Sequence, residues 1–209
     1  MALAGPQPAR LILASASPRR RELLAQAGYI FSVEAADVDE SQRGGEDAAA
    51  YVLRLAEEKA HAIFARHRAE DTEDEPLIVL GADTCVVCGG ADDEELLGKP
   101  VDSDDAMRML CLLSSRTHHV LTGVAVVTRS GTASDVESTE VTFAPIPEGE
   151  LIAYCATPEP LDKAGAYGIQ GYAARWIPRI DGCYFNVMGL PIARTVELIE
   201  SRTRSIVSR

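Results

Sequence analysis

The chain has 209 residues and a formal net charge of −12, with 46% hydrophobic and 25% charged residues. This composition is typical of a folded globular protein, and the acidic excess opposes broad binding to nucleic acid or to an anionic membrane. No apolar stretch approaches the roughly 20 residues that span a bilayer, and the segment 1–8 lacks the pattern of a signal peptide. We therefore expect a cytoplasmic protein that binds no polynucleotide and no membrane.

The first half of the chain alternates between short apolar runs and helical stretches. Ser17-Pro18 has the pattern of a helix N-cap followed by a proline, and Gly28 suits the position just after the helix. The aliphatic run at 77–87 predicts a strand that is buried on both faces. The elements expected in chain order are a strand at 10–15, a helix at 17–28, a strand at 29–33, a helix at 46–68 and the strand at 77–87.

The second half predicts three more helices and a hairpin. A turn at Gly89-Gly90 leads to Leu96-Leu97, and the later elements are a helix at 103–113, strands at 119–128 and 136–143, a helix at 148–155, a glycine-containing loop at 162–171 and a helix at 191–201. Helices mixed with isolated and hairpin strands predict a mixed α/β fold. We interpret residues 1–209 as a single domain, with two lobes around a cleft as the alternative.

The five cysteines do not suggest a disulfide framework, because they are odd in number and scattered. Cys85 and Cys88 have the C-x-x-C spelling, but no second pair follows at zinc-site spacing and both lie in an expected strand. We favour buried reduced thiols over a metal or redox site. His118 and His119 lead into the next strand, where side chains alternate between faces, so only one of them can point inward.

Three consecutive arginines, Arg19, Arg20 and Arg21, crowd the first turn of the helix expected after Ser17. Cations at that end oppose the helix dipole. An anion held between the free backbone N–H groups, the guanidinium groups and the hydroxyls of Ser15 and Ser17 would relieve the conflict. We favour a phosphate site, and the alternative is that the arginines point into solvent and pair with surface carboxylates.

Lys59 and Asp83 are further candidates for a site. Lys59 shares an apolar helical stripe with Leu55 and Ile63, where a lysine either meets an anion or extends to the surface. Asp83 follows the run at 77–82 and is expected near the carboxyl end of the strand, at the edge where ligands gather in open α/β sheets, or it caps the next turn. The carboxylates around Glu40 add hard oxygen ligands that suit a magnesium-bridged phosphate.

Known nucleotide-binding loops are absent from the sequence. Lys99 is followed by Pro100, which rules out a P-loop, and no G-x-G-x-x-G follows a strand, so no Rossmann cofactor is expected. Lys99 instead adds a cation in a rigid turn. The loop at 162–171 has three glycines for close backbone approach and one amide, Gln170, that can read the edge of a base.

Eight short motifs together resemble one known family, the Maf-like nucleoside triphosphate pyrophosphatases. They follow that family's order and spacing: LASASPRR at 13–20, DES at 39–41, EKA at 58–60, GADT at 81–84, GKP at 98–100, TGV at 122–124, DKAGAYGIQG at 162–171 and NVMGLP at 186–191. The resemblance implies a mixed, elongated sheet flanked by helices with a deep cleft between two lobes, similar to the inosine triphosphate pyrophosphatases.

The resemblance also implies a role for each matching residue. Asp83 matches the catalytic proton acceptor of the family. The positions that match its substrate-specificity residues are Arg19, Thr84 and Gln170. The matches to phosphate ligands are Ser15, Arg20, Lys59, Lys99 and Lys163, and the matches to ligands of a divalent cation, Mg²⁺ or Mn²⁺, are Glu40 and Asp83.

The implied reaction is hydrolysis of a nucleoside triphosphate to the monophosphate and pyrophosphate, in a house-cleaning role. The AYGIQG form of the loop at 166–171 resembles the branch that acts on dTTP and UTP, and CTP or a modified pyrimidine nucleotide is a further substrate to consider. The alternatives are the same reaction on 7-methyl-GTP or another modified nucleotide, and a regulator of cell division that binds a nucleotide. We also hypothesise a homodimer.

Overall fold

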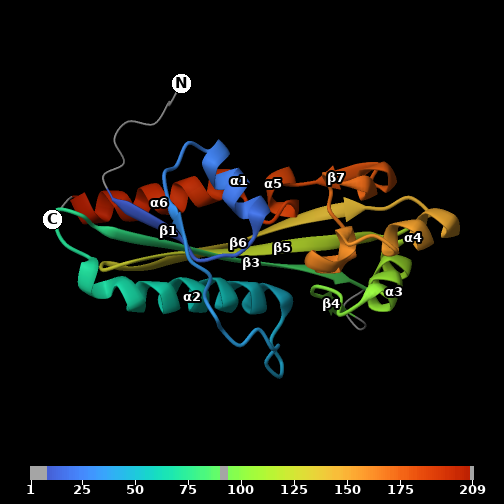
Figure 1. Ribbon diagram of the computed structural model, residues 1–209, viewed down its shortest axis with the longest axis horizontal. Helices are drawn as coiled ribbons and strands as arrows, with labels where there is room; N and C mark the ends of the chain where they lie inside the picture. Colours follow the sequence, from blue (N-terminus) through green and yellow to red (C-terminus); the bar gives the residue numbers. More distant parts are fainter. Residues whose placement is uncertain (1–8, 90–93, 208–209) are drawn as a thin grey trace. The chain divides into compact units, whose positions relative to one another are not determined.

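The computed structural model describes residues 9–89 and 94–207 (Figure 1). The chain divides into two compact units. Unit 1 contains the described residues of 1–83, 122–137 and 189–209, and unit 2 contains those of 84–121 and 138–188. The single-domain interpretation, the deep cleft and the likeness to inosine triphosphate pyrophosphatases stay predictions.

The described strands form one mixed sheet of seven strands, which confirms the predicted α/β class. The strand order is β2-β1-β3-β5-β6-β7, and β4 pairs with β3. β1 is parallel to β2 and β3, whereas β4 is antiparallel to β3 and β7 is antiparallel to β6. The bounds are β1 Arg10–Leu13, β2 Ser32–Val33, β3 Leu77–Cys88, β4 Glu95–Leu97, β5 Thr117–Thr128, β6 Gly131–Thr142 and β7 Arg179–Asp181.

Three of the described helices begin at a residue whose side chain caps them. Ser17 accepts a hydrogen bond from the Arg20 backbone N–H at 3.4 Å, and Asp47 and Asp102 cap two further helices in the same way. The bounds are α1 Pro18–Gln26, α2 Ala48–His67, α3 Ser103–Leu113, α4 Glu148–Cys155, α5 Tyr184–Val187 and α6 Ile192–Val207. None of the described helices is both long and apolar enough to cross a membrane.

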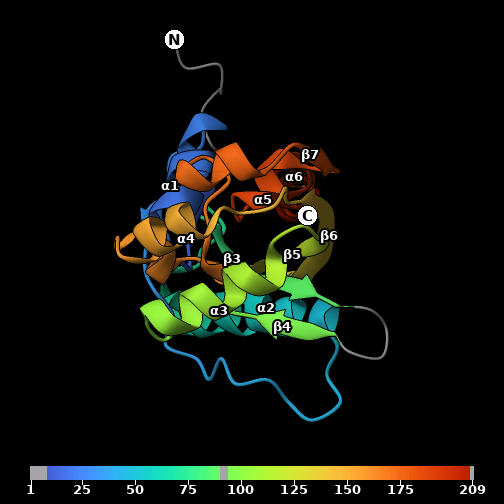
Figure 2. The same ribbon diagram turned by 90° about the vertical axis from the view of Figure 1, so that its right-hand side faces the viewer.

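In unit 1, α2 covers one face of the sheet, and α1 and α6 cover the other (Figures 1 and 2). The alanines Ala56 and Ala60 of α2 pack with apolar residues of β1, β3 and β5. A methyl group added at Gly81 of β3 would overlap the Ala56 carbonyl oxygen, and one at Gly123 of β5 would overlap the Val52 carbonyl oxygen. The two glycines therefore let the backbone of α2 lie directly against the sheet.

The core of unit 2 is partly aromatic. Phe143, Tyr167 and His118 meet edge to face, with ring centroids 4.8–5.5 Å apart. His118 is buried and His119 is exposed, which confirms that only one histidine points inward. The side-chain amide of Asn186 is fully buried and donates hydrogen bonds to the Val120 carbonyl and the Thr139 hydroxyl.

Some elements differ from the sequence-based predictions. The strand expected at 29–33 is reduced to Ser32–Val33, and the last helix runs to Val207 instead of 201. β7 and α5 were not expected, because each is only three or four residues long and depends on its tertiary neighbours. Cys85 and Cys88 of β3 are both buried and reduced, as predicted, while Gly90 lies outside the described residues.

Candidate active site

Lys59 lies between two carboxylates in unit 1. Its Nζ is 2.7 Å from Asp83 Oδ1 and 2.6 Å from Glu40 Oε1. The side chains of Lys59 and Asp83 are only 9% and 13% exposed, whereas that of Glu40 is 56% exposed. The lysine therefore turns inward to meet anions and does not extend to the surface.

The packing of α2 explains how Lys59 reaches Asp83. Gly81 and Asp83 lie two residues apart on β3, so both face the same side of the sheet. Because Gly81 has no side chain, the α2 backbone at Ala56 and Ala60 can approach β3 closely. Lys59 lies between these two alanines on the same helix, so its ammonium can reach the Asp83 carboxylate. The GADT motif thus combines a packing glycine with an acid directed at the helix.

Arg20 links three segments of unit 1 close to Asp83. Its Nε donates to the Gly189 carbonyl at 2.8 Å, and its Nη1 donates to the Ala82 carbonyl at 2.8 Å and to Ser15 Oγ at 3.1 Å. Burial lowers the pKa of the Arg20 guanidinium, against the opposing effect of the Asp83 carboxylate. The structure therefore brings Ser15 and Arg20 to the backbone that precedes Asp83.

The other two arginines of the motif differ in exposure. Arg19 is half-buried in the first turn of α1, and Arg21 is exposed. At this helix N-terminus, Arg19 and Arg20 are thus partly buried, whereas Arg21 faces solvent. The negative charge of a phosphate at this end would be stabilised by the helix dipole and by the guanidinium groups.

The remaining predicted residues belong to unit 2. Thr84 follows Asp83 on β3 and is half-buried. Lys99 is exposed and forms no ion pair within the described part of the chain. Lys163 Nζ donates to the Glu159 carbonyl and to Asp162 Oδ1, both at 2.6 Å, so it supports the base of its own loop. The Gln170 side chain is exposed, and its amide makes no hydrogen bond to any described residue.

The loop that carries Gln170 depends on its glycines. Gly165 has a φ of +67°, a conformation that favours glycine. A side chain at Gly168 would lie 2.8 Å from Lys163 Cε, and one at Gly171 would overlap the Glu159 carboxylate. The loop backbone is therefore packed tightly against the side chains of Lys163 and Glu159, while the Gln170 amide stays exposed.

Two carboxylates, Asp83 and Glu40, are the candidate ligands of a divalent cation. Among residues 9–89 and 94–207, no group of three or more His, Cys, Asp or Glu side chains is arranged to hold a metal ion. Mg²⁺ is commonly held by one or two carboxylates together with the phosphates of a substrate. The donor set thus fits a cation shared with a phosphate ligand, and does not fit a cage built from protein alone.

Sequence reasoning missed a group of residues around Glu40. Tyr51 and Arg54 of α2 hydrogen-bond to the backbone of the Glu40 loop, and Glu46 forms a two-bond ion pair with Arg54. Tyrosine, arginine and glutamate are ordinary surface residues, so their types alone gave no signal. The Gly189 carbonyl was missed as well. It belongs to the NVMGLP motif, but the sequence did not predict that this motif contacts Arg20.

Comparison with known proteins assigns the chain to a family. The family model described as Maf-like protein matches residues 10–202. Proteins named dTTP/UTP pyrophosphatase from Hahella chejuensis and Myxococcus xanthus are each 50% identical, and in both cases the match covers 91% of this chain and 91% of the relative. One from Anaeromyxobacter sp. is 51% identical over 91% of this chain and 88% of its own length. The chain belongs to the Maf-like protein family.

Proposed function

We propose that this protein hydrolyses dTTP and UTP to the nucleoside monophosphate and pyrophosphate. The observation that carries the proposal is the buried Lys59 held between Asp83 and Glu40, beside the Arg20 and Ser15 contacts. Relatives about half identical in sequence bear the name dTTP/UTP pyrophosphatase. The site places a carboxylate that can accept a proton beside cations that can stabilise phosphate charge. Cleavage of a phosphoric anhydride requires both kinds of group.

Asp83 serves as the general base in this proposal. Its carboxylate takes a proton from the attacking water, the new P–O bond forms, and the anhydride bond between the α- and β-phosphates breaks to release pyrophosphate. Lys59 fixes the orientation of the Asp83 carboxylate through its 2.7 Å contact. The positive charges of Lys59 and Arg20 stabilise the negative charge that develops on the phosphate oxygens.

A divalent cation, Mg²⁺ or Mn²⁺, would be held by Glu40 and Asp83 and would neutralise phosphate charge when bound. Glu40 suits this part because its carboxylate is half exposed while its position is fixed by Lys59. Lys99 and Lys163 are proposed to bind further phosphate oxygens. Lys99 needs no release from an ion pair with another described residue before it does so.

Recognition of the base is assigned to Gln170, with Thr84 and Arg19. The exposed Gln170 amide offers both a donor and an acceptor. Thymine and uracil present an N–H flanked by carbonyl oxygens, so one amide can pair with this edge in both bases. This shared edge explains why a single residue would accept dTTP and UTP alike.

The test is the identity of the products. Purified protein is incubated with dTTP or UTP and Mg²⁺, and pyrophosphate and orthophosphate are measured separately. The proposal predicts one pyrophosphate for each monophosphate formed, and a higher kcat/KM for these two substrates than for purine triphosphates or 7-methyl-GTP. Release of orthophosphate as the first product would contradict it. The homodimer stays a prediction that light scattering can test.

A further inference from the structure

The loop that carries Glu40 is fastened to α2 at Glu40 itself and at the next residue. The Tyr51 hydroxyl donates a hydrogen bond to the Glu40 carbonyl at 2.9 Å, and Arg54 Nη2 donates to the Ser41 carbonyl at 3.0 Å. The same helix carries Lys59, which contacts the Glu40 carboxylate. The backbone and the side chain of Glu40 are thus both held by residues of α2.

Arg54 and Glu46 form the centre of this attachment. Arg54 Nε is 2.6 Å from Glu46 Oε1 and Nη2 is 2.8 Å from Oε2, while the two side chains are only 12% and 9% exposed. These hydrogen bonds lower the pKa of Glu46 to about 2. Arg54 also donates to Glu58 from Nη1 at 3.2 Å, and its guanidinium lies over the Tyr51 ring at 5.6 Å. The guanidinium thus donates from two nitrogens to the two oxygens of one carboxylate, which the single ammonium of a lysine cannot do.

Glu46 in turn secures the loop backbone. Its Oε2 accepts a hydrogen bond from the Arg43 N–H at 3.1 Å, and its carbonyl accepts one from the Gln42 side chain at 2.8 Å. Between these contacts the loop contains Gly44 and Gly45, and Gly45 has a φ of +77°. Glycines increase the conformational freedom of a chain that is not held, so the loop would sample many shapes without the contacts to α2.

The loop buries no large apolar side chain, so its enclosed ion pair does not support a hydrophobic core. It meets the candidate active site through the Glu40 carboxylate, which contacts Lys59. The ordering of the loop therefore has its main effect at that carboxylate. Because the conformation is fixed before any ligand arrives, the entropy cost of placing Glu40 is met during folding and not during binding.

We propose that Tyr51, Arg54 and Glu46 form a clamp that positions Glu40 for the divalent cation and the substrate phosphates. The clamp residues touch neither substrate nor cation and act through Glu40. The proposal rests on the proposed function, since it assigns Glu40 a part in that reaction. It adds that a set of ion pairs and hydrogen bonds beside the site tunes the affinity for the cation.

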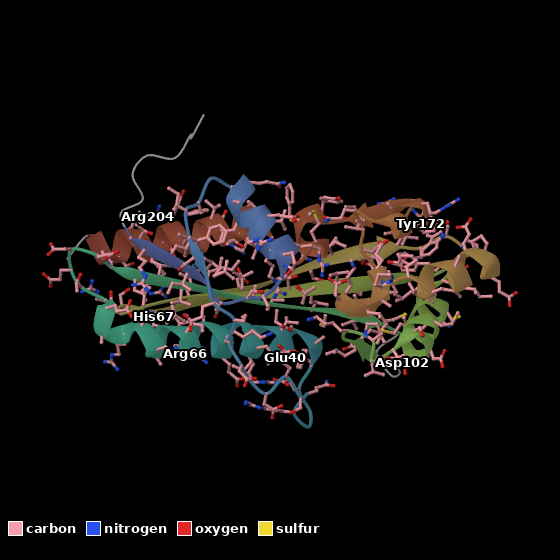
Figure 3. The ribbon with its side chains drawn as sticks, in the orientation of Figure 1. Glu40, Arg66, His67, Asp102, Tyr172 and Arg204 are labelled. Atoms are coloured by element: carbon pink, nitrogen blue, oxygen red, sulfur yellow. The ribbon has the colours of Figure 1, made fainter. Side chains whose placement is uncertain are left out.

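The experiment compares Arg54→Gln with a matched control on the same helix, Arg66→Gln. Arg66 also forms an ion pair, with Glu34 at 3.0 Å, but it lies toward the other end of α2 from Glu40 (Figure 3). The first readout is hydrogen–deuterium exchange of segment 39–46 without nucleotide or metal. The second is the Mg²⁺ concentration that gives the half-maximal rate of dTTP hydrolysis.

We expect Arg54→Gln to speed exchange in segment 39–46 and to raise the half-maximal Mg²⁺ concentration by about tenfold, the size typical of residues that support a metal ligand. Arg66→Gln is expected to change neither. Because the clamp acts through Glu40, adding Arg54→Gln to Glu40→Gln is expected to cause no further loss. If the arginine variant unfolds, Tyr51→Phe, which removes one hydroxyl, takes its place with the same expected directions.

Unchanged exchange in segment 39–46 would overturn the clamp. An Arg54→Gln effect of equal size in the wild-type and Glu40→Gln backgrounds would also overturn it, because Arg54 would then act elsewhere. If the wild-type protein does not hydrolyse dTTP, the proposed function fails, and the exchange measurement still reports on the clamp separately. The two failures are therefore distinguishable.

Discussion

The buried His118 predicts a specific dependence of stability on pH. Its side chain is 1% exposed and its Nε2 is 2.8 Å from the Tyr167 hydroxyl. Its other ring nitrogen, Nδ1, is buried without a hydrogen-bond partner among the described residues. Burial lowers the pKa of His118 to about 3, so the imidazole stays neutral in the folded protein at any pH above that value.

The size of the effect follows from the two pKa values. The unfolded chain binds a proton at this histidine near pH 6.5, whereas the folded protein does not until about pH 3. Between these values the unfolded state holds more protons, so the free energy of unfolding falls as the pH falls. At pH 5 the loss is about 2 kcal/mol relative to pH 8, at 1.36 kcal/mol for each pH unit below 6.5.

The assay is urea unfolding of the wild type and His118→Gln at several pH values from 8 to 5. We expect the wild type to be the more stable protein at pH 8, and its advantage to shrink by about 2 kcal/mol by pH 5. His67→Gln is the control of opposite sign. Contacts with Glu34 and Glu70 raise the pKa of His67, so its stabilising effect is present at low pH and disappears as the pH rises through the folded pKa. If the difference in free energy of unfolding between the wild type and His118→Gln stays constant from pH 8 to 5, His118 is not a neutral buried histidine.

Three substitutions test the site more directly. Gly81→Ala places a methyl group against the Ala56 carbonyl and 2.9 Å from the Ala60 backbone nitrogen. We expect the free energy of unfolding in urea to fall by about 1–3 kcal/mol and pyrophosphate release to slow. Wild-type values of both would show that the close packing is unnecessary. Gln170→Leu is expected to lower kcat/KM for dTTP about tenfold without moving the urea midpoint, and an equal loss for every triphosphate would argue against base recognition. Lys99→Ala is expected to raise KM for dTTP while changing stability by less than about 0.5 kcal/mol; an unchanged KM would remove it from the phosphate site.

Local signals in the sequence were enough for most of the fold. Ser17-Pro18 marked the start of α1, and α3 and α4 have the bounds expected from their patterns. Apolar residues on both sides of Asp83 and Thr84 made the run at 77–87 the central strand β3, so Asp83 lies inside the strand and not near its carboxyl end as expected. β7 was missed because a three-residue strand with exposed ends exists only through its pairing with β6.

The candidate site was only partly accessible from the sequence. The types and positions of Lys59 and Asp83 indicated an anion and an acid, but their 2.7 Å contact depends on how closely α2 packs on Gly81. The same limit applies to Arg20, whose three acceptors come from distant segments of unit 1. Contacts between residues far apart in sequence follow from tertiary packing, and no local pattern encodes them.

The central claim is that Asp83 is the base for cleavage of the α–β anhydride bond of dTTP. The most direct measurement compares pyrophosphate release from dTTP with Mg²⁺ by the wild type and Asp83→Asn, with dTTP binding measured separately. The proposal predicts that the variant folds and still binds dTTP while its rate falls by about 10²–10⁴-fold, the range for loss of a general base. Release of pyrophosphate by Asp83→Asn at the wild-type rate would contradict it.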